Sequence, residues 1–177
     1  KKILLKSYNK SLFTDKLFLE KKFSIKNIKD KNCIFVNCIN SKTSLDYEKL
    51  GSQLYIFLKN NKIERSFFIS SSSFLTNVQL EKLLHGAQLK SYEFNVYKTN
   101  KTKNEKYNLY VVGDKSKKSN VLRNKLNSIL EGVFLTRDLV SEPGNVLHPD
   151  EYAKRILKLK KIGLKIKVYN EKELKKL

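Results

Sequence analysis

The sequence contains no methionine or tryptophan and only two prolines, two cysteines and six glycines among its 177 residues. Cys33 and Cys38 fall in one apolar run that predicts a strand, and at their spacing the two side chains leave opposite faces of it. They therefore cannot form a disulfide with each other, and two free thiols are typical of a reducing cytoplasm. Because the chain starts at Lys1 and lacks methionine, we expect it to be part of a longer translation product.

Long hydrophobic runs are also missing from the sequence. No run approaches the roughly 18 apolar residues needed to cross a bilayer, and the N-terminus lacks the apolar core and cleavage site of a secretory signal. We therefore expect a cytoplasmic protein with no membrane contact. Hydrophobic residues still make up 40% of the chain and aromatic residues 11%, so the composition predicts a packed core and excludes a disordered chain.

Acidic residues and arginine are scarce, and the formal net charge is +20. The arginines are Arg65, Arg123, Arg137 and Arg155. Proteins that read nucleic acid favour arginine, because its planar guanidinium binds phosphate and guanine in two places. Here the basic residues are mostly lysines, spread along the chain among Asn, Ile and Tyr, which all have A/T-rich codons. We interpret the charge as solvated surface set by base composition, and a basic α/β module that binds nucleic acid or another polyanion stays open as the alternative.

Strand and helix patterns alternate along the first two thirds of the chain. Short apolar runs predict strands at residues 2–6, 33–39, 65–70 and 107–112. Apolar residues at intervals of three to five predict helices at 44–59, with Ser44 as N-cap, and at 77–92. The β-α-β-α-β order after residue 32 predicts parallel strand pairing in a layered α/β domain that covers residues 1–115.

The longest pattern predicts a helix at residues 117–141, within a linker segment that we place at 116–141. At 1.5 Å per residue this helix would be roughly 37 Å long, and Pro143 follows its end. Beyond it the patterns predict a helix, a strand and a helix at residues 149–163, 164–168 and 171–177. Because the last helix stops after about two turns, we expect residues 142–177 to be the truncated beginning of a second α/β domain.

Three stretches of the sequence, in the correct order, resemble the leucyl aminopeptidase (cytosol aminopeptidase) family. Residues 136–149 read TRDLVSEPGNVLHP and resemble the signature R-D-[LI]-x-[NS]-x-P-x-N-x-x-x-P, which opens the family's catalytic domain. Residues 163–177 (GLKIKVYNEKELKKL) resemble the strand and helix that come next, and residues 86–98 (GAQLKSYEFNVYK) resemble a segment of the N-terminal domain. The matching positions around the signature are Arg137, Asp138, Leu139, Glu142, Pro143, Gly144, Asn145 and Pro149, with Tyr152 and Ala153 beyond it.

The resemblance implies a two-domain exopeptidase of the cytoplasm that acts on peptides. It implies a macro-domain-like N-terminal domain with a layered sheet and flanking helices, a long linker helix, and a peptidase domain that forms homo-hexamers. That second domain would bind two divalent metal ions (manganese, zinc or magnesium), which activate a bridging water and polarise the peptide carbonyl. The family's metal-binding segments, G-K-G-x-x-[FY]-D-[ST]-G-G and N-T-D-A-E-G-R, do not occur in this sequence. We therefore assign no catalytic and no metal-binding residue, leave substrate-binding residues unassigned, and expect the chain alone to be inactive.

Several polar residues are better explained by structure than by chemistry. His85 and His148 have no His or Cys close in sequence that would complete a metal site. His148 stands where the family often has a capping threonine, and an imidazole is a poorer N-cap than a hydroxyl. For Asp138 and Glu142 we predict ion-pair or capping roles, and for Asn145 a role in the turn.

Two further features bear on the binding alternative. Gly113 and Asp114 follow a predicted strand, but no glycine-rich phosphate-binding motif accompanies them. In residues 86–98, three aromatic residues lie among lysines; such residues can stack on bases, although packing against the fold is the interpretation that we favour. A non-catalytic paralogue of the aminopeptidase family is a third possibility.

Overall fold

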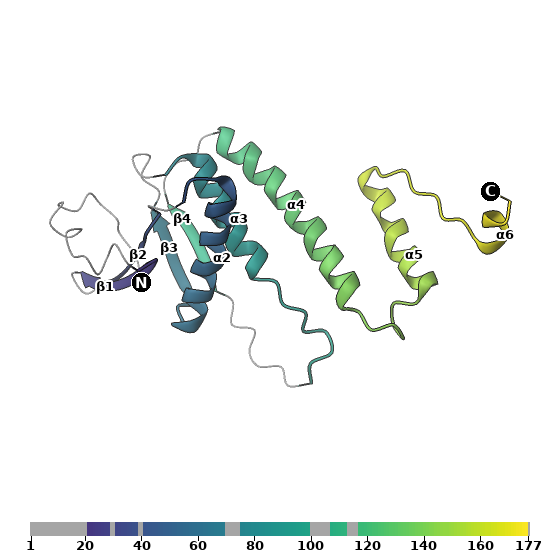
Figure 1. The fold of residues 1–177 in the computed structure, drawn as a ribbon, viewed down its shortest axis with the longest axis horizontal. Coiled ribbons are helices and arrows are strands. Elements are labelled where there is room, and N and C mark those ends of the chain that lie inside the picture. Colours follow the sequence, from purple (N-terminus) through teal and green to yellow (C-terminus); the bar gives the residue numbers. More distant parts are fainter. Residues whose placement is uncertain are drawn as a thin grey trace. The chain divides into compact units, whose positions relative to one another are not determined.

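The computed structural model describes residues 21–28, 31–38, 41–69, 75–99, 107–112 and 117–176 (Figure 1). In chain order its elements are β1 (Phe23–Ile28), β2 (Lys31–Val36), α2 (Ser44–Asn60), β3 (Arg65–Ile69), α3 (Asn77–Lys90), β4 (Asn108–Val112), α4 (Lys117–Ser141), α5 (Pro149–Leu157), the 3₁₀ helix η2 (Lys158–Ile162) and α6 (Glu171–Leu174). The strand predicted at residues 2–6 and the pair Gly113–Asp114 lie outside the described residues. Within the described residues, no helix has both the length and the apolar character needed to cross a bilayer.

The described strands form two two-stranded sheets. β3 and β4 pair in parallel, as predicted for a β-α-β unit whose crossover contains α3. The prediction that β2 also joins a parallel sheet is wrong for the described residues, because β2 pairs with β1 in an antiparallel hairpin. Only two residues separate β1 from β2, and so short a connection permits only antiparallel pairing. The α/β class is confirmed.

Helices α2 and α3 each begin with a capping box. In α2 the N-cap is Thr43 and not Ser44, so that prediction is wrong by one residue. The Thr43 backbone N–H donates to the Asp46 carboxylate at 2.8 Å, and the Asp46 N–H donates to the Thr43 hydroxyl at 3.2 Å. Hydrogen bonds from Thr43 and from the Lys42 backbone lower the pKa of Asp46. Thr76 caps α3 in the same way with Gln79 at the third position.

The core lies where α2 packs against α3 and the strands. Its buried members are Cys33, Ile34, Tyr47, Leu50, Leu54, Leu58, Leu75 and Leu83. They come from β2, from successive turns of α2, and from α3 and the residue before its cap, so one apolar stripe of each helix faces inward. Burial of these side chains is the main source of stability for this part of the chain.

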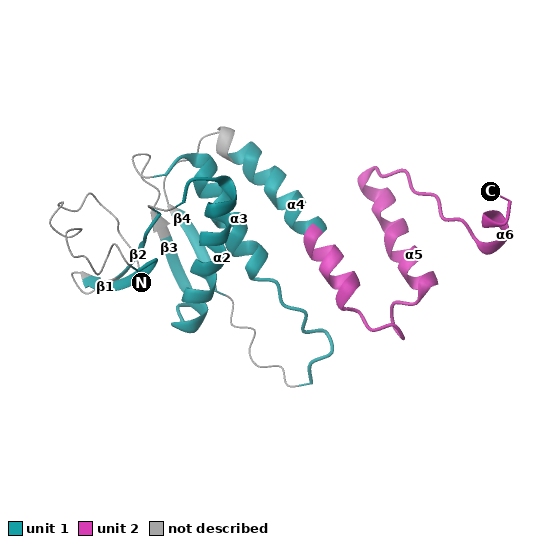
Figure 2. Cartoon of the chain, viewed as in Figure 1, with its two compact units in different colours: residues 1–132 teal, residues 133–177 magenta. Residues whose placement is uncertain are grey.

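The chain divides into two compact units, residues 1–132 and residues 133–177, which are coloured separately in Figure 2. The boundary falls within α4, whose bounds agree with the predicted helix at 117–141. Our division at residues 115 and 141 therefore stays a prediction about domains. The predicted strand at 164–168 is wrong: those residues form no strand, and none of the described strands pairs with them. A strand satisfies its backbone hydrogen bonds only beside a neighbour.

Candidate functional site

The segment that carries the family signature connects α4 to α5 through a tight turn. The Glu142 backbone N–H donates to the Asp138 carbonyl at 3.1 Å and ends the α4 hydrogen-bond pattern. The backbone N–H groups of Val146 and Leu147 then both donate to the Pro143 carbonyl at 2.9 Å. Proline cannot continue the helix, because its ring clashes with the preceding turn. The sequence therefore folds locally as helix, turn and helix.

An ion pair closes this turn. The Arg155 guanidinium of α5 donates from Nη1 to Oε1 of Glu142 at 2.9 Å and from Nε to Oε1 of Glu151 at 3.3 Å. The Glu142 side chain is 9% exposed, whereas that of Arg155 is 25% exposed. These hydrogen bonds, first the one to Glu142 and then the one to Glu151, raise the pKa of Arg155. Glu142 thus forms the ion pair that we predicted for it, with a partner thirteen residues away in sequence.

The start of α5 shows how the His148 substitution is accommodated. His148 occupies the N-cap position, and its side chain makes no capping hydrogen bond. Its carbonyl accepts from the Tyr152 N–H at 2.9 Å, so the helix still forms. Pro149 at the first helical position needs no acceptor, and Asp150 and Glu151 place negative charge at the positive end of the helix dipole. Asn145 lies in the turn, as predicted.

In the first unit, α2 and α3 approach so closely that only glycine fits at two points of contact. A Cβ atom on Gly86 would overlap the Glu48 carbonyl oxygen of α2, and one on Gly51 would overlap the Leu83 carbonyl oxygen of α3. The Ser52 hydroxyl donates to the Gly86 carbonyl at 3.0 Å. Gly86 opens the stretch that resembles the family's N-terminal segment, so this glycine has a packing role.

His85 is placed at the same contact. It is 5% exposed, and its Nδ1 lies 3.1 Å from Oε1 of Glu48, to which the Lys82 ammonium also donates at 2.9 Å. Burial opposes ionisation of Glu48, but the hydrogen bonds from Lys82 and His85 outweigh it and lower the pKa of this carboxyl. His85 is therefore a buried, hydrogen-bonded residue of the helix contact, in agreement with the structural role predicted for it.

The sequence did not indicate a buried carboxylate on α3. Glu81 of α3 is 2% exposed, and it accepts two hydrogen bonds at 3.1 Å from Nε of Arg123, one at each carboxylate oxygen. The Arg123 Nη2 also donates to Glu81. The two residues are 42 positions apart, and nothing in the local sequence of either indicates the pairing. This ion pair fixes the first half of α4 to α3.

The aromatic stretch before β4 is neither helix nor strand. Phe94 and Tyr97 pack against each other with ring centroids 5.9 Å apart and planes tilted by 54°. Glu93 accepts from Lys59 of α2 and from Asn95, so the segment is tied to the helix end. Tyr97 is 50% exposed, so its ring packs on Phe94 at the surface, and the predicted packing against the fold is not confirmed for it.

Comparison with known proteins relates much of the chain to one group. No family model matches it. A probable cytosol aminopeptidase of Gluconobacter oxydans is 38% identical over 94 residues, which are 52% of this chain and 19% of that protein. One of Phytoplasma mali is 32% identical over 108 residues, or 58% of this chain and 22% of that protein. One of Sinorhizobium fredii is 34% identical over 141 residues, or 76% of this chain and 28% of that protein.

The fold agrees with these similarities. A mutant of tomato leucine aminopeptidase superimposes on 87% of this chain and 32% of its own with a TM-score of 0.72, at 17% sequence identity. The chain belongs to the leucyl aminopeptidase family. It spans 19% to 28% of the length of the three cytosol aminopeptidases. This partial coverage fits the prediction that it is the N-terminal part of such a protein.

The described part of the chain does not fit the two metal ions that the family resemblance implies. Among the described residues, no group of three or more His, Cys, Asp and Glu side chains could hold a metal ion. His85 shares its surroundings with one carboxylate and one ammonium, and that set does not favour a cation.

Proposed function

We propose that the chain is the N-terminal portion of a metal-dependent leucyl aminopeptidase that releases N-terminal amino acids from peptides in the cytoplasm. The observation that carries the proposal is the match to the Sinorhizobium fredii protein over 141 residues, at 34% identity. The shared fold with a leucine aminopeptidase supports it. On this proposal, the first unit corresponds to the macro-like domain of the family, and the two metal ions and the catalytic residues belong to the rest of the protein.

The chain's own residues would hold the start of the peptidase domain in place. The Glu142–Arg155 ion pair fixes the turn between α4 and α5, and the Glu81–Arg123 pair fixes α4 to α3. Both pairs join an arginine to a carboxylate that is 9% exposed or less, and such pairs keep their geometry better than solvated ones. The first unit would then shape the active-site entrance and support assembly of a homo-hexamer.

The test is an activity assay on the complete protein that contains this chain. Supplied with manganese or zinc ions, it should release leucine from leucinamide, and a chelator should abolish the release. A complete protein that is folded and metal-loaded but releases no amino acid from any N-terminal substrate would contradict the proposal.

The 177-residue chain provides the matched control. At the same molar concentration and with the same metal ions, we expect it to release no leucine, because the proposal places the catalytic groups elsewhere. Release by the chain alone, lost on chelation, would refute that placement while leaving the aminopeptidase activity itself in force.

A further inference from the structure

The β3–β4 sheet has two unlike faces. Ser66 of β3 is 2% exposed, and its partner in the parallel register, Leu109, packs against the core beneath the helices. Because side chains alternate along a strand, the neighbouring pair, Phe67 and Tyr110, belongs to the opposite face. One face of the sheet therefore packs against the core, and the other face carries aromatic rings.

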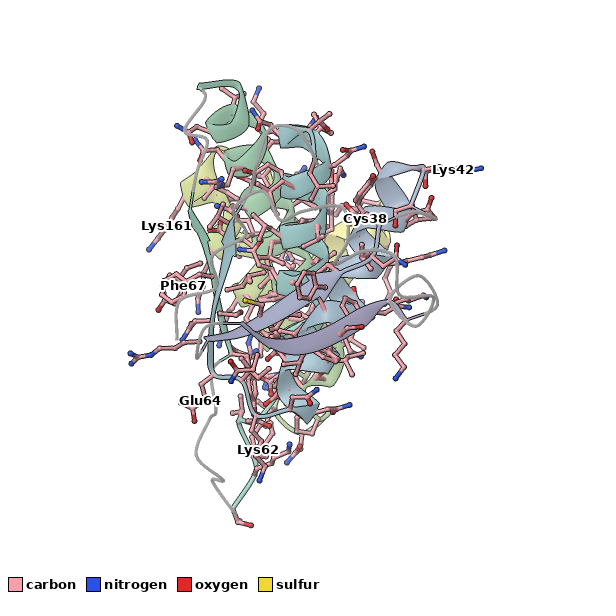
Figure 3. The ribbon with its side chains drawn as sticks, turned by 90° about the vertical axis from the view of Figure 1, so that its left-hand side faces the viewer. Cys38, Lys42, Lys62, Glu64, Phe67 and Lys161 are labelled. Atoms are coloured by element: carbon pink, nitrogen blue, oxygen red, sulfur yellow. The ribbon has the colours of Figure 1, made fainter. Side chains whose placement is uncertain are left out.

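The two rings form a short aromatic stack. Phe67 and Tyr110 stack with centroids 5.2 Å apart and planes inclined by 23°. Tyr110 is 46% exposed, which is unusual for an aromatic residue within a parallel sheet. Figure 3 shows the Phe67 side chain directed away from α2 and α3. The pair differs from Phe94 and Tyr97, whose planes are tilted by 54° and do not stack.

Positive charge lies beside this aromatic stack. Arg65 is two residues before Phe67 in β3, so it belongs to the same face of the sheet, and it is exposed. Within the described residues it forms no ion pair. Its guanidinium can bind a phosphate through two donors. The chain as a whole carries a formal net charge of +20, which complements a polyanion.

We propose that this face of the sheet binds single-stranded nucleic acid, with an unpaired base extending the Phe67–Tyr110 stack and a neighbouring phosphate bound by Arg65. An unpaired base offers its flat π-face to an aromatic ring, and stacking of this kind tolerates any base. In a duplex the bases stack on one another and are not available to the rings. The site is therefore specific for single strands and has little sequence preference.

The test compares two labelled strands of equal length, oligoadenylate and an abasic strand with the same phosphates, by fluorescence anisotropy with the full 177-residue chain. At about 150 mM salt, where generic lysine binding is weak, we expect oligoadenylate to bind at least about tenfold more tightly than the abasic strand. Phe67→Ala and Tyr110→Ala should each remove most of that difference, whereas the ring-preserving Phe67→Tyr and Tyr110→Phe should retain it.

Two further variants separate stacking from charge and from misfolding. Tyr97→Ala removes a ring that is 50% exposed elsewhere, and it should bind both strands like the wild type. Arg65→Gln should weaken binding to both strands and lower the slope of log affinity against log salt by about one. Circular dichroism selects variants that keep the wild-type fold.

Equal affinity for the two strands in the wild type, or an unchanged difference in the alanine variants, would overturn the proposal and leave only lysine electrostatics. Self-association of the chain that the alanine variants abolish would overturn it too, because a second copy would then cover the face. These outcomes are independent of leucine release by the complete protein, so failure here and failure of the aminopeptidase proposal are distinguishable.

Discussion

The two compact units of this chain are each stabilised by different interactions. Among the described residues, the buried hydrophobic ones, from Cys33 to Leu126, lie in the unit that covers residues 1–132. Among the described residues of 133–177, none is buried, and α5, η2 and α6 contribute no core side chain. The first unit therefore has its own hydrophobic core, whereas the second depends on local hydrogen bonds, caps and ion pairs.

This difference indicates which unit buries enough apolar surface to be stable by itself. Burial of apolar surface is the dominant favourable term in folding, and a helix without a covered apolar face is marginal in water. Within the second unit, Tyr152, Ile162 and Leu164 are 47%, 75% and 51% exposed. We infer that these elements become stable when the rest of the proposed peptidase domain covers them.

We expect the largest loss of stability in the first unit when the contact between α2 and α3 is disrupted. Gly86→Ala places a methyl group against the Glu48 backbone, which cannot move without separating the two helices. We expect the free energy of unfolding of the first unit to fall by about 3 kcal/mol or more, measured by urea titration. The amide spectrum of residues in the second unit should not change.

Gly132→Ala is the matched control for that change. Gly132 lies within α4, and a Cβ placed there would have no atom within 4 Å other than its chain neighbours and the helix's own backbone. Alanine loses less conformational entropy in a helix than glycine, so this variant should gain about 0.5–1 kcal/mol. Equal effects of the two substitutions would show that backbone propensity, and not close helix packing, determines stability at Gly86.

A smaller effect is expected from the ion pair that joins α4 to α3. Arg123→Ala leaves the Glu81 carboxylate 2% exposed in the native contact with its main donor removed. Because the Arg123 side chain is itself 40% exposed, we expect a loss of about 2 kcal/mol and not the larger cost of a fully buried pair. Lys125→Ala, an exposed position on the same helix, should cost less than about 0.5 kcal/mol in the same urea titration. A similar loss in both variants would contradict a specific role for the pair.

The smallest effect concerns pH. Because the pKa of Glu48 is lowered in the folded chain, its contribution to stability is complete above the ordinary value of about 4.5 and is lost as the pH falls through the lowered value. The difference in free energy of unfolding between the wild type and Glu48→Gln should therefore be about 1 kcal/mol at pH 7 and should shrink towards pH 3. A difference that grows on acidification would show that the hydrogen bonds from Lys82 and His85 do not favour the ionised form of Glu48.

Long periodic elements could be predicted from the sequence alone. The helix at 117–141 was predicted with both ends correct, because its apolar residues repeat over many turns before Pro143 ends it. The strands at 65–70 and 107–112 were placed to within one residue at each end, since β-branched and aromatic runs there are bounded by polar residues. The signature turn was located because its residue types are specific.

Features that depend on distant contacts could not be predicted. The Glu81–Arg123 pair joins residues from two helices, and the local sequence of neither helix indicates how the two are rotated relative to each other. The α2 cap was misplaced because Thr43 and Ser44 are both good capping residues, and only Asp46 three residues after Thr43 distinguishes them. The strand predicted at 164–168 has the right alternation but no pairing partner among the described strands.

Hydrogen–deuterium exchange on the complete 177-residue chain tests most directly whether its stability resides in the first unit. We predict that the amides of Leu50–Leu58 in α2 and Leu80–Ala87 in α3 exchange only by global unfolding, as expected for helices around a core. The amides of Tyr152–Leu157 in α5 should exchange at least about a hundredfold faster, through local opening. Equal protection of α5 and α2 would contradict the account, because it would mean that the second unit is as stable as the first without any further part of the protein.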